Sequence, residues 1–215
     1  MVWAHLIKKE MLSQLRSQSS IQSLILYVFS TTFIVFTAFF EITPKAWITL
    51  YWIILILSLS NTAQQSFFEL KGIQAWYYYA STSVHHYFIS KVVTVFILLV
   101  VISLCIVGGL SLFSSFVIKD VGLFILTNML SLIGLSVIFT FISFIVVKVQ
   151  GKSALLPLLA FPLLVPILSL CVRLSSISAG LIMDTQYEMD LLLLLGVDMI
   201  AIALSLLLIR YLWQS

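Results

Sequence analysis

Charged residues are scarce in this chain. They make up 9% of its 215 residues, whereas about 25% is usual for a soluble domain. Hydrophobic residues make up 62%. So few charges cannot cover a water-exposed surface, which excludes a soluble domain of this size. Nearly all the charges lie in the gaps between six long apolar stretches, and this pattern is typical of a polytopic membrane protein.

Catalytic and metal-binding signatures are missing as well. The sequence has no Gly-rich phosphate loop of the form G-x-x-x-x-G-K-S/T, no H-E-x-x-H, and no paired acids or Ser-x-x-Lys dyad placed for catalysis. Two isolated cysteines, Cys105 and Cys171, support neither a disulfide framework nor a metal site. No Lys/Arg-rich run suits nucleic acid. We therefore predict no catalytic residues, no metal, no cofactor bound by this chain and no nucleic-acid partner.

The apolar stretches are long enough to cross a bilayer, which takes about 20 residues for about 30 Å of hydrocarbon. We expect spans at about 21–40, 47–67, 92–113, 122–147, 154–174 and 191–212. Residues 1–18 place Trp3 and several aliphatic residues on one helical arc, which predicts an amphipathic interfacial helix. The fold class is thus all-α, with residues 1–215 forming a single transmembrane domain in contact with the lipid bilayer. Tilt or membrane re-entry near 108–122 stays open.

Basic residues divide unevenly between the two sides of the predicted bundle. The side that holds both termini carries eight of the 11: Lys8, Lys9, Arg16, Lys71, Lys91, Lys148, Lys152 and Arg210. The other side carries Lys45, Lys119 and Arg173. That second side also holds the acids Glu41, Asp120, Asp184, Glu188 and Asp190. The positive-inside rule therefore predicts a bacterial inner-membrane protein with its N- and C-termini in the cytoplasm.

The largest cytoplasmic gap, residues 68–91, combines aromatic and charged side chains. Its candidate contact residues are Glu69, Lys71, Gly72, Trp76, Tyr77, Tyr78 and Tyr79. One interpretation is a short surface helix that docks into a groove on a soluble partner, because aromatic side chains supply contact area with a polar handle. The other is that the aromatics lie in the lipid interface. His85 and His86 are adjacent and diverge by about 100° on a helix, which favours an interfacial polar pair over a metal or haem site.

Asp198 is an ionisable residue inside a predicted span. It lies seven residues into the sixth span, or about 10 Å along the helix at 1.5 Å per residue. An ionisable group at such a place is a candidate for transport or proton handling. It can instead pair with a lysine, be protonated, or hydrogen-bond a hydroxyl as packing between helices. Asn61 and Asn128 are further polar residues within or near spans.

The fifth span contains three prolines within ten residues, Pro157, Pro162 and Pro166. Proline removes a backbone donor and bends a helix. Neighbouring groups must then satisfy the freed carbonyls, because lipid offers no hydrogen bonds. The prolines are consistent with a helix that moves and equally with one that is permanently kinked.

Two segments resemble the CcmB family, the membrane subunit of the ABC-type haem exporter used in cytochrome c maturation. The first is SFFELKGIQAWYYYASTSVHHYFISK, residues 66–91, where an acid precedes a glycine, a run of large residues and a lysine that opens the third span. The second is LLPLLAFPLLVPIL, residues 155–168, with its P-x-x-x-P spacing at Pro162 and Pro166. The topology of six spans with both termini inside is similar as well.

The resemblance implies an ABC-2-like permease that pairs with a cytoplasmic ABC ATPase subunit and with a second copy of itself. It implies that ATP is used by the partner, that the 68–91 segment is the coupling element, and that haem is a possible cargo. It further implies a haem-handling membrane subunit and a periplasmic haem chaperone as partners. Two alternatives stay open: an ABC-2-type permease for another substrate, and a membrane assembly scaffold that transports nothing.

Overall fold

The computed structural model describes residues 18–38, 42–68, 84–114, 118–148, 155–183 and 186–214. They form six α-helices: α2 (Gln18–Ala38), α3 (Pro44–Phe68), α5 (Val84–Phe113), α6 (Val121–Lys148), α7 (Leu155–Ser178) and α8 (Tyr187–Gln214). No strand occurs among these residues, which confirms the all-α class for the described part. Four helices, α5 to α8, are long and apolar enough to cross a membrane. The predicted interfacial helix lies outside the described residues, apart from its last position.

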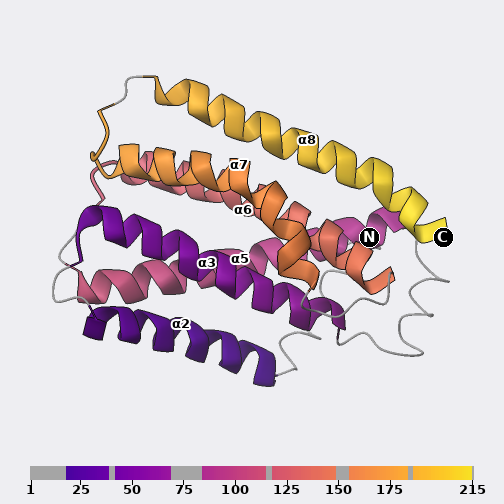
Figure 1. The fold of residues 1–215 in the computed structure, drawn as a ribbon, viewed down its shortest axis with the longest axis horizontal. Helices are drawn as coiled ribbons and strands as arrows, with labels where there is room; N and C mark the ends of the chain where they lie inside the picture. Colours follow the sequence, from indigo (N-terminus) through magenta and orange to yellow (C-terminus); the bar gives the residue numbers. More distant parts are fainter. Residues whose placement is uncertain are drawn as a thin grey trace.

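The helices form an elongated bundle in which successive helices run in opposite directions (Figure 1). Helices α2 and α8 lie at opposite edges, and α6 lies inside, packed against α3, α5, α7 and α8. Of the apolar stretch of α6, 72% is buried within the bundle, against 33%, 33% and 22% for α5, α7 and α8. Helix α6 is therefore the axis around which the others are arranged.

Local sequence signals set the helix ends at one end of the bundle. The Thr43 hydroxyl accepts a hydrogen bond from the Ala46 N–H at 3.3 Å, and Pro44 takes the first helical position of α3, where no donor is needed. Asp120 caps α6 in the same way, because its Oδ1 accepts the Leu123 N–H at 2.9 Å. These caps satisfy amide donors that the first helical turn would otherwise leave without partners.

Gly180 ends α7. Its φ is 72°, a left-handed conformation that glycine adopts without steric cost. Its N–H donates to the Ile177 carbonyl at 2.8 Å, and the Leu181 N–H donates to the Ser176 carbonyl at 3.0 Å. This pair of bonds is a Schellman motif, and it closes the helix before the turn into α8.

Helix α5 begins at Val84, eight residues before the predicted start of the third span at Val92. The extra turns are held by packing. Tyr87 and Phe88 are buried, and their rings lie 5.7 and 5.8 Å from the ring of Phe144 on α6. Lys91, which the charge pattern places at a helix mouth, is buried, with Nζ 5.9 Å from the centre of the Tyr87 ring. The last part of the predicted 68–91 loop is therefore helix packed on α6.

The outer faces of the bundle are strongly apolar. On α2, Leu26, Phe29, Phe33 and Ile34 are all more than half exposed. Exposed leucines, isoleucines and methionines also follow α8. Exposing such faces to lipid costs no free energy, whereas exposing them to water is unfavourable. The exposed faces and the apolar lengths of the helices together identify a multi-pass membrane protein.

Candidate functional site: the polar core around α6

A closed ring of three hydrogen bonds joins α3, α5 and α6. The Tyr51 hydroxyl donates to Asn128 Oδ1 at 2.8 Å, and Asn128 Nδ2 donates to Ser103 Oγ at 2.7 Å. Ser103 Oγ lies 2.8 Å from the Tyr51 oxygen. Because the Tyr51 proton is already given to Asn128, Ser103 is the donor in this third contact. All three side chains are buried, so the ring ties together three helices where water cannot compete.

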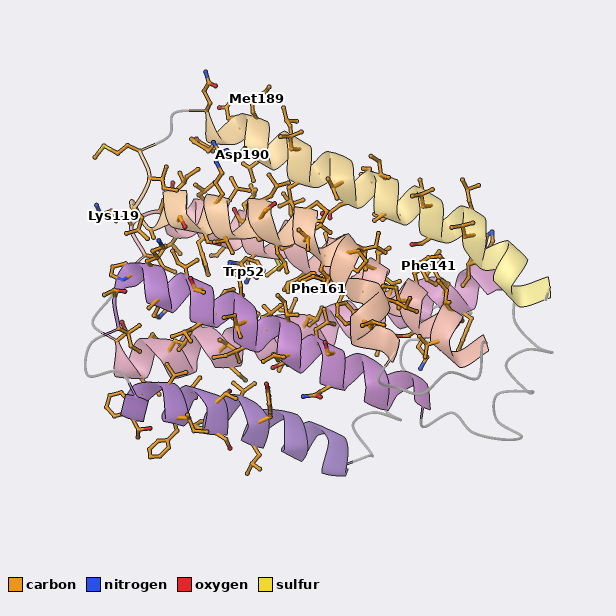
Figure 2. The ribbon with its side chains drawn as sticks, viewed as in Figure 1. Trp52, Lys119, Phe141, Phe161, Met189 and Asp190 are labelled. Atoms are coloured by element: carbon orange, nitrogen blue, oxygen red, sulfur yellow. The ribbon has the colours of Figure 1, made fainter. Side chains whose placement is uncertain are left out.

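Two further polar contacts attach α7 to this core. Trp52 Nε1 donates to Ser175 Oγ at 3.1 Å, and Figure 2 shows Trp52 lying between α3 and α7. The Ser131 hydroxyl of α6 forms a hydrogen bond with the buried Cys171 thiol. Each contact places a polar group of α7 against a partner on another helix. The C-terminal half of α7 is therefore fixed to both α3 and α6.

Pro162 and Pro166 lie on the face of α7 opposite to the one that contacts α3 and α6. Pro162 and Pro166 are exposed, whereas the buried face is formed by Ala160, Leu164, Ile167, Cys171 and Leu174. The helix bends along its length but stays continuous through both prolines (Figure 1). Pro157 is the third residue of α7, near its start. Pro162 and Pro166 thus face outward, away from the buried face of α7 that carries Cys171.

Asp198 of α8 faces α6 at Gly134. The carboxyl is 3% exposed, and neither of its oxygens has a hydrogen-bond partner among the described residues. A Cβ placed on Gly134 would lie 2.8 Å from Asp198 Cγ and 3.3 Å from Ile167 Cδ1. Only a residue without a side chain leaves room for this carboxyl. Since α8 begins at Tyr187, Asp198 lies about 16 Å along it, deeper than the predicted span start suggested.

An ion pair joins α7 and α8 at the end of the bundle opposite the start of α5. Arg173 Nε lies 3.0 Å from Asp190 Oδ2, with Asp190 largely buried and Arg173 half exposed. Figure 2 places Asp190 at the start of α8 and Lys119 near the same end. Asp120 N–H also donates to the Ser178 carbonyl at 2.9 Å, which ties the α5–α6 turn to the end of α7. This end of the bundle is held by polar contacts as well as packing.

The predicted site residues divide into two groups. Asp198, Pro157, Pro162 and Pro166 lie in the described helices, and of these Asp198 alone is placed against α6, at Gly134. The predicted coupling residues Glu69, Lys71, Gly72, Trp76, Tyr77, Tyr78 and Tyr79 lie outside the described residues. Sequence reasoning missed Tyr51, Ser103 and Gly134. The partial signal for the ring was Asn128, a polar residue within a span that requires a partner.

We expect Tyr51→Phe to lower the free energy of unfolding by about 1–2 kcal/mol, because the change leaves Asn128 Oδ1 without its donor and the Ser103 proton without its acceptor. Equilibrium unfolding in mixed detergent micelles measures this. Tyr27→Phe is the matched control, since Tyr27 is only half buried at the edge of the bundle and should change stability by less than about 0.5 kcal/mol. Equal effects of the two changes would show that the ring adds nothing to stability.

A comparison with protein-family models matches residues 1–209 to one described as CcmB protein. The match covers nearly the whole chain, including all of α2 to α7 and most of α8. No curated protein and no solved structure matches the chain.

Proposed function

Because the chain belongs to the CcmB family, the membrane component of the haem exporter for cytochrome c maturation, we propose that it couples ATP hydrolysis by a partner ATPase to haem delivery. The coupled step is delivery of haem, or release of the loaded chaperone on the far side of the membrane. The family match over residues 1–209 is the observation that carries the proposal. The chain is a transport subunit rather than an enzyme, and ATP is hydrolysed by the partner.

The proposed topology is that of an ABC-2-like permease with six spans in the bacterial inner membrane. The start of α2 and the end of α8 lie at one end of the bundle, together with the start of α5 and the end of α6. We place this end in the cytoplasm, because eight of the 11 basic residues lie, by sequence position, in the segments beyond the helix ends here or within the helices near those ends. The α2–α3, α5–α6 and α7–α8 connections, with the Arg173–Asp190 pair, then face the periplasm.

The proposed coupling element is the 68–91 segment, with Glu69, Lys71, Gly72 and the aromatic run 76–79 as ATPase contacts. Its last part is the start of α5, where Tyr87 and Phe88 pack on Phe144. A force applied to the segment would therefore pass into α5 and into α6 together. Since α6 contacts four other helices, such a force would reach the polar core.

The proposed assembly contains a second copy of this chain, the ATPase, a haem-handling membrane subunit and a periplasmic haem chaperone. Haem is the cargo of the complex. Pro166 removes the backbone donor that the Pro162 carbonyl, four residues earlier, would otherwise accept from, and in lipid a neighbouring group must satisfy that carbonyl instead.

A pull-down of the tagged chain from its native cells in mild detergent tests the proposal. We expect an ABC ATPase to co-purify, and at least a tenfold loss of it when residues 76–79 are all replaced by alanine, because the aromatic anchors of the contact are removed. The matched control replaces Phe29 and Phe33, two exposed aromatics of α2, and should leave the ATPase bound.

The alternatives give different results in the same experiment. An ATPase that co-purifies while holo-cytochrome c stays normal after deletion of the gene favours a permease for another substrate. Absence of any ATPase favours an assembly scaffold. ATPase binding that survives replacement of residues 76–79 would show that coupling occurs elsewhere on the chain.

A further inference from the structure

Asp198 is buried, and no described residue neutralises its charge. Both carboxyl oxygens are without a hydrogen bond among the described residues, and the carboxyl lies against the backbone of Gly134 on α6. An ionised carboxylate in such a place loses its hydration and gains nothing in return. A buried acid without a counter-charge instead keeps its proton. The surroundings of Asp198 therefore favour the protonated form of its carboxyl group.

Among the described residues, the groups that face Asp198 from the neighbouring helices supply no cation. Helix α6 has no charged residue between Val121 and Val146. Helix α7 contributes the Cys171 thiol, and its Arg173 is paired with Asp190 near the start of α8. Glu188, the other acid in the first turn of α8, is exposed.

Helix α5, the third helix against α8, contributes the Cys105 thiol and, near its start, His85, His86 and Lys91. These three basic residues lie far from Gly134 along the bundle. Tyr87, one turn before Lys91, packs on Phe144 of α6, which is ten residues beyond Gly134, or about 15 Å along the helix. No described cation therefore compensates a charge on Asp198.

We propose that Asp198 is a proton-binding site within the membrane: it holds a proton while α8 is packed on α6 at Gly134, and releases it to water when α8 moves off α6. The proposal does not depend on the transported substrate. In the packed state the neutral acid fills the space beside Gly134. In the separated state water reaches the carboxyl, and the carboxylate becomes the stable form.

Proton binding by Asp198 and the packing of α8 on α6 influence each other. Proton binding favours the packed state, and a rise in pH favours separation of α8 from α6, because each state differs in its affinity for the same proton. Asp198 would thus bias any movement of α8 by the pH of the side from which water enters. Aspartate suits this role because its short side chain reaches only as far as the Gly134 backbone.

Infrared spectroscopy of the full chain in lipid nanodiscs tests the proposal. At neutral pH, where a water-exposed aspartate is ionised, we expect the carbonyl stretch of one protonated carboxyl group. Asp198→Asn should remove this band, and Asp190→Asn should leave it, because Asp190 is paired with Arg173. If the spectra of the wild type and of Asp198→Asn are the same at neutral pH, Asp198 is ionised in the folded chain. That result would overturn the proposal.

A second pair of variants tests the link to packing. Gly134→Ala should displace the carboxyl, so that its band disappears at neutral pH and returns only on acidification. Gly196→Ala, at a glycine of α8 with open space around it, should leave the band as in the wild type. A Gly134→Ala protein that keeps the wild-type band and titration would show that proton binding is independent of the α6–α8 contact.

Discussion

Gly134→Ala is expected to lower the free energy of unfolding by about 3 kcal/mol, although alanine is the better helix former. In an open helix position the same change gains about 0.5–1 kcal/mol. At Gly134 the new methyl group would meet Asp198 Cγ at 2.8 Å and Ile167 Cδ1 at 3.3 Å. Overpacking of this kind typically costs about 1–3 kcal/mol, and the displaced carboxyl adds to that cost. The steric conflict therefore outweighs the gain in helix propensity.

Gly196→Ala is the matched control, because a Cβ there meets no atom within 4 Å. Detergent-induced unfolding followed by circular dichroism should show no loss of stability for this variant and a clear loss for Gly134→Ala. The double variant Gly134→Ala/Asp198→Ala identifies the cause. If the conflict is with the carboxyl, removing it should recover most of the lost stability, giving a coupling energy of about 1–2 kcal/mol. Additive effects would place the conflict elsewhere.

The sequence predicts the helices well because each depends on a local property. An apolar run that must cross lipid can only be helical, and each of the six helices overlaps one of the apolar stretches. The start of α5 differs for a physical reason. The segment around Lys91 reads as a polar interface, but Tyr87 and Phe88 find Phe144, 57 and 56 residues further along the chain, and extend the helix. Such a contact leaves no local signature.

The polar core could be predicted only in part. Asp198 is conspicuous because a carboxylate is rare in an apolar run. Its neighbour Gly134 gives no signal, since its role is to lack a side chain. The ring of hydrogen bonds joins Tyr51 to residues 52 and 77 positions further along the chain. A single sequence does not show which polar residues face each other. Pro162 and Pro166 are evident in the sequence, whereas their place on the exposed face depends on how α7 is rotated.

Trp52→Ala is expected to have the largest effect on stability, a loss of about 3–5 kcal/mol in the free energy of unfolding. Trp52 is buried, its ring lies edge-on to Tyr51 at 5.2 Å, and its Nε1 donates to Ser175 at 3.1 Å. Removing the ring leaves a cavity between α3 and α7, the Ser175 hydroxyl without its donor, and Tyr51 without one side of its packing. Lipid cannot fill an enclosed space, so the contacts are lost outright.

Trp52→Phe separates the hydrogen bond from the ring. It keeps most of the packing and removes the donor, so we expect a loss of about 1–2 kcal/mol, of which about 1 kcal/mol is the bond to Ser175. Phe161→Ala is the control for aromatic size, since Phe161 lies on the exposed face of α7 with 67% of its surface accessible. Lipid replaces its contacts, so its removal should cost less than about 0.5 kcal/mol. Unfolding of the purified chain in mixed micelles measures all three. A Phe161→Ala loss as large as that of Trp52→Ala would mean that the lipid-facing side of α7, and not its contact with α3, holds the helix in place.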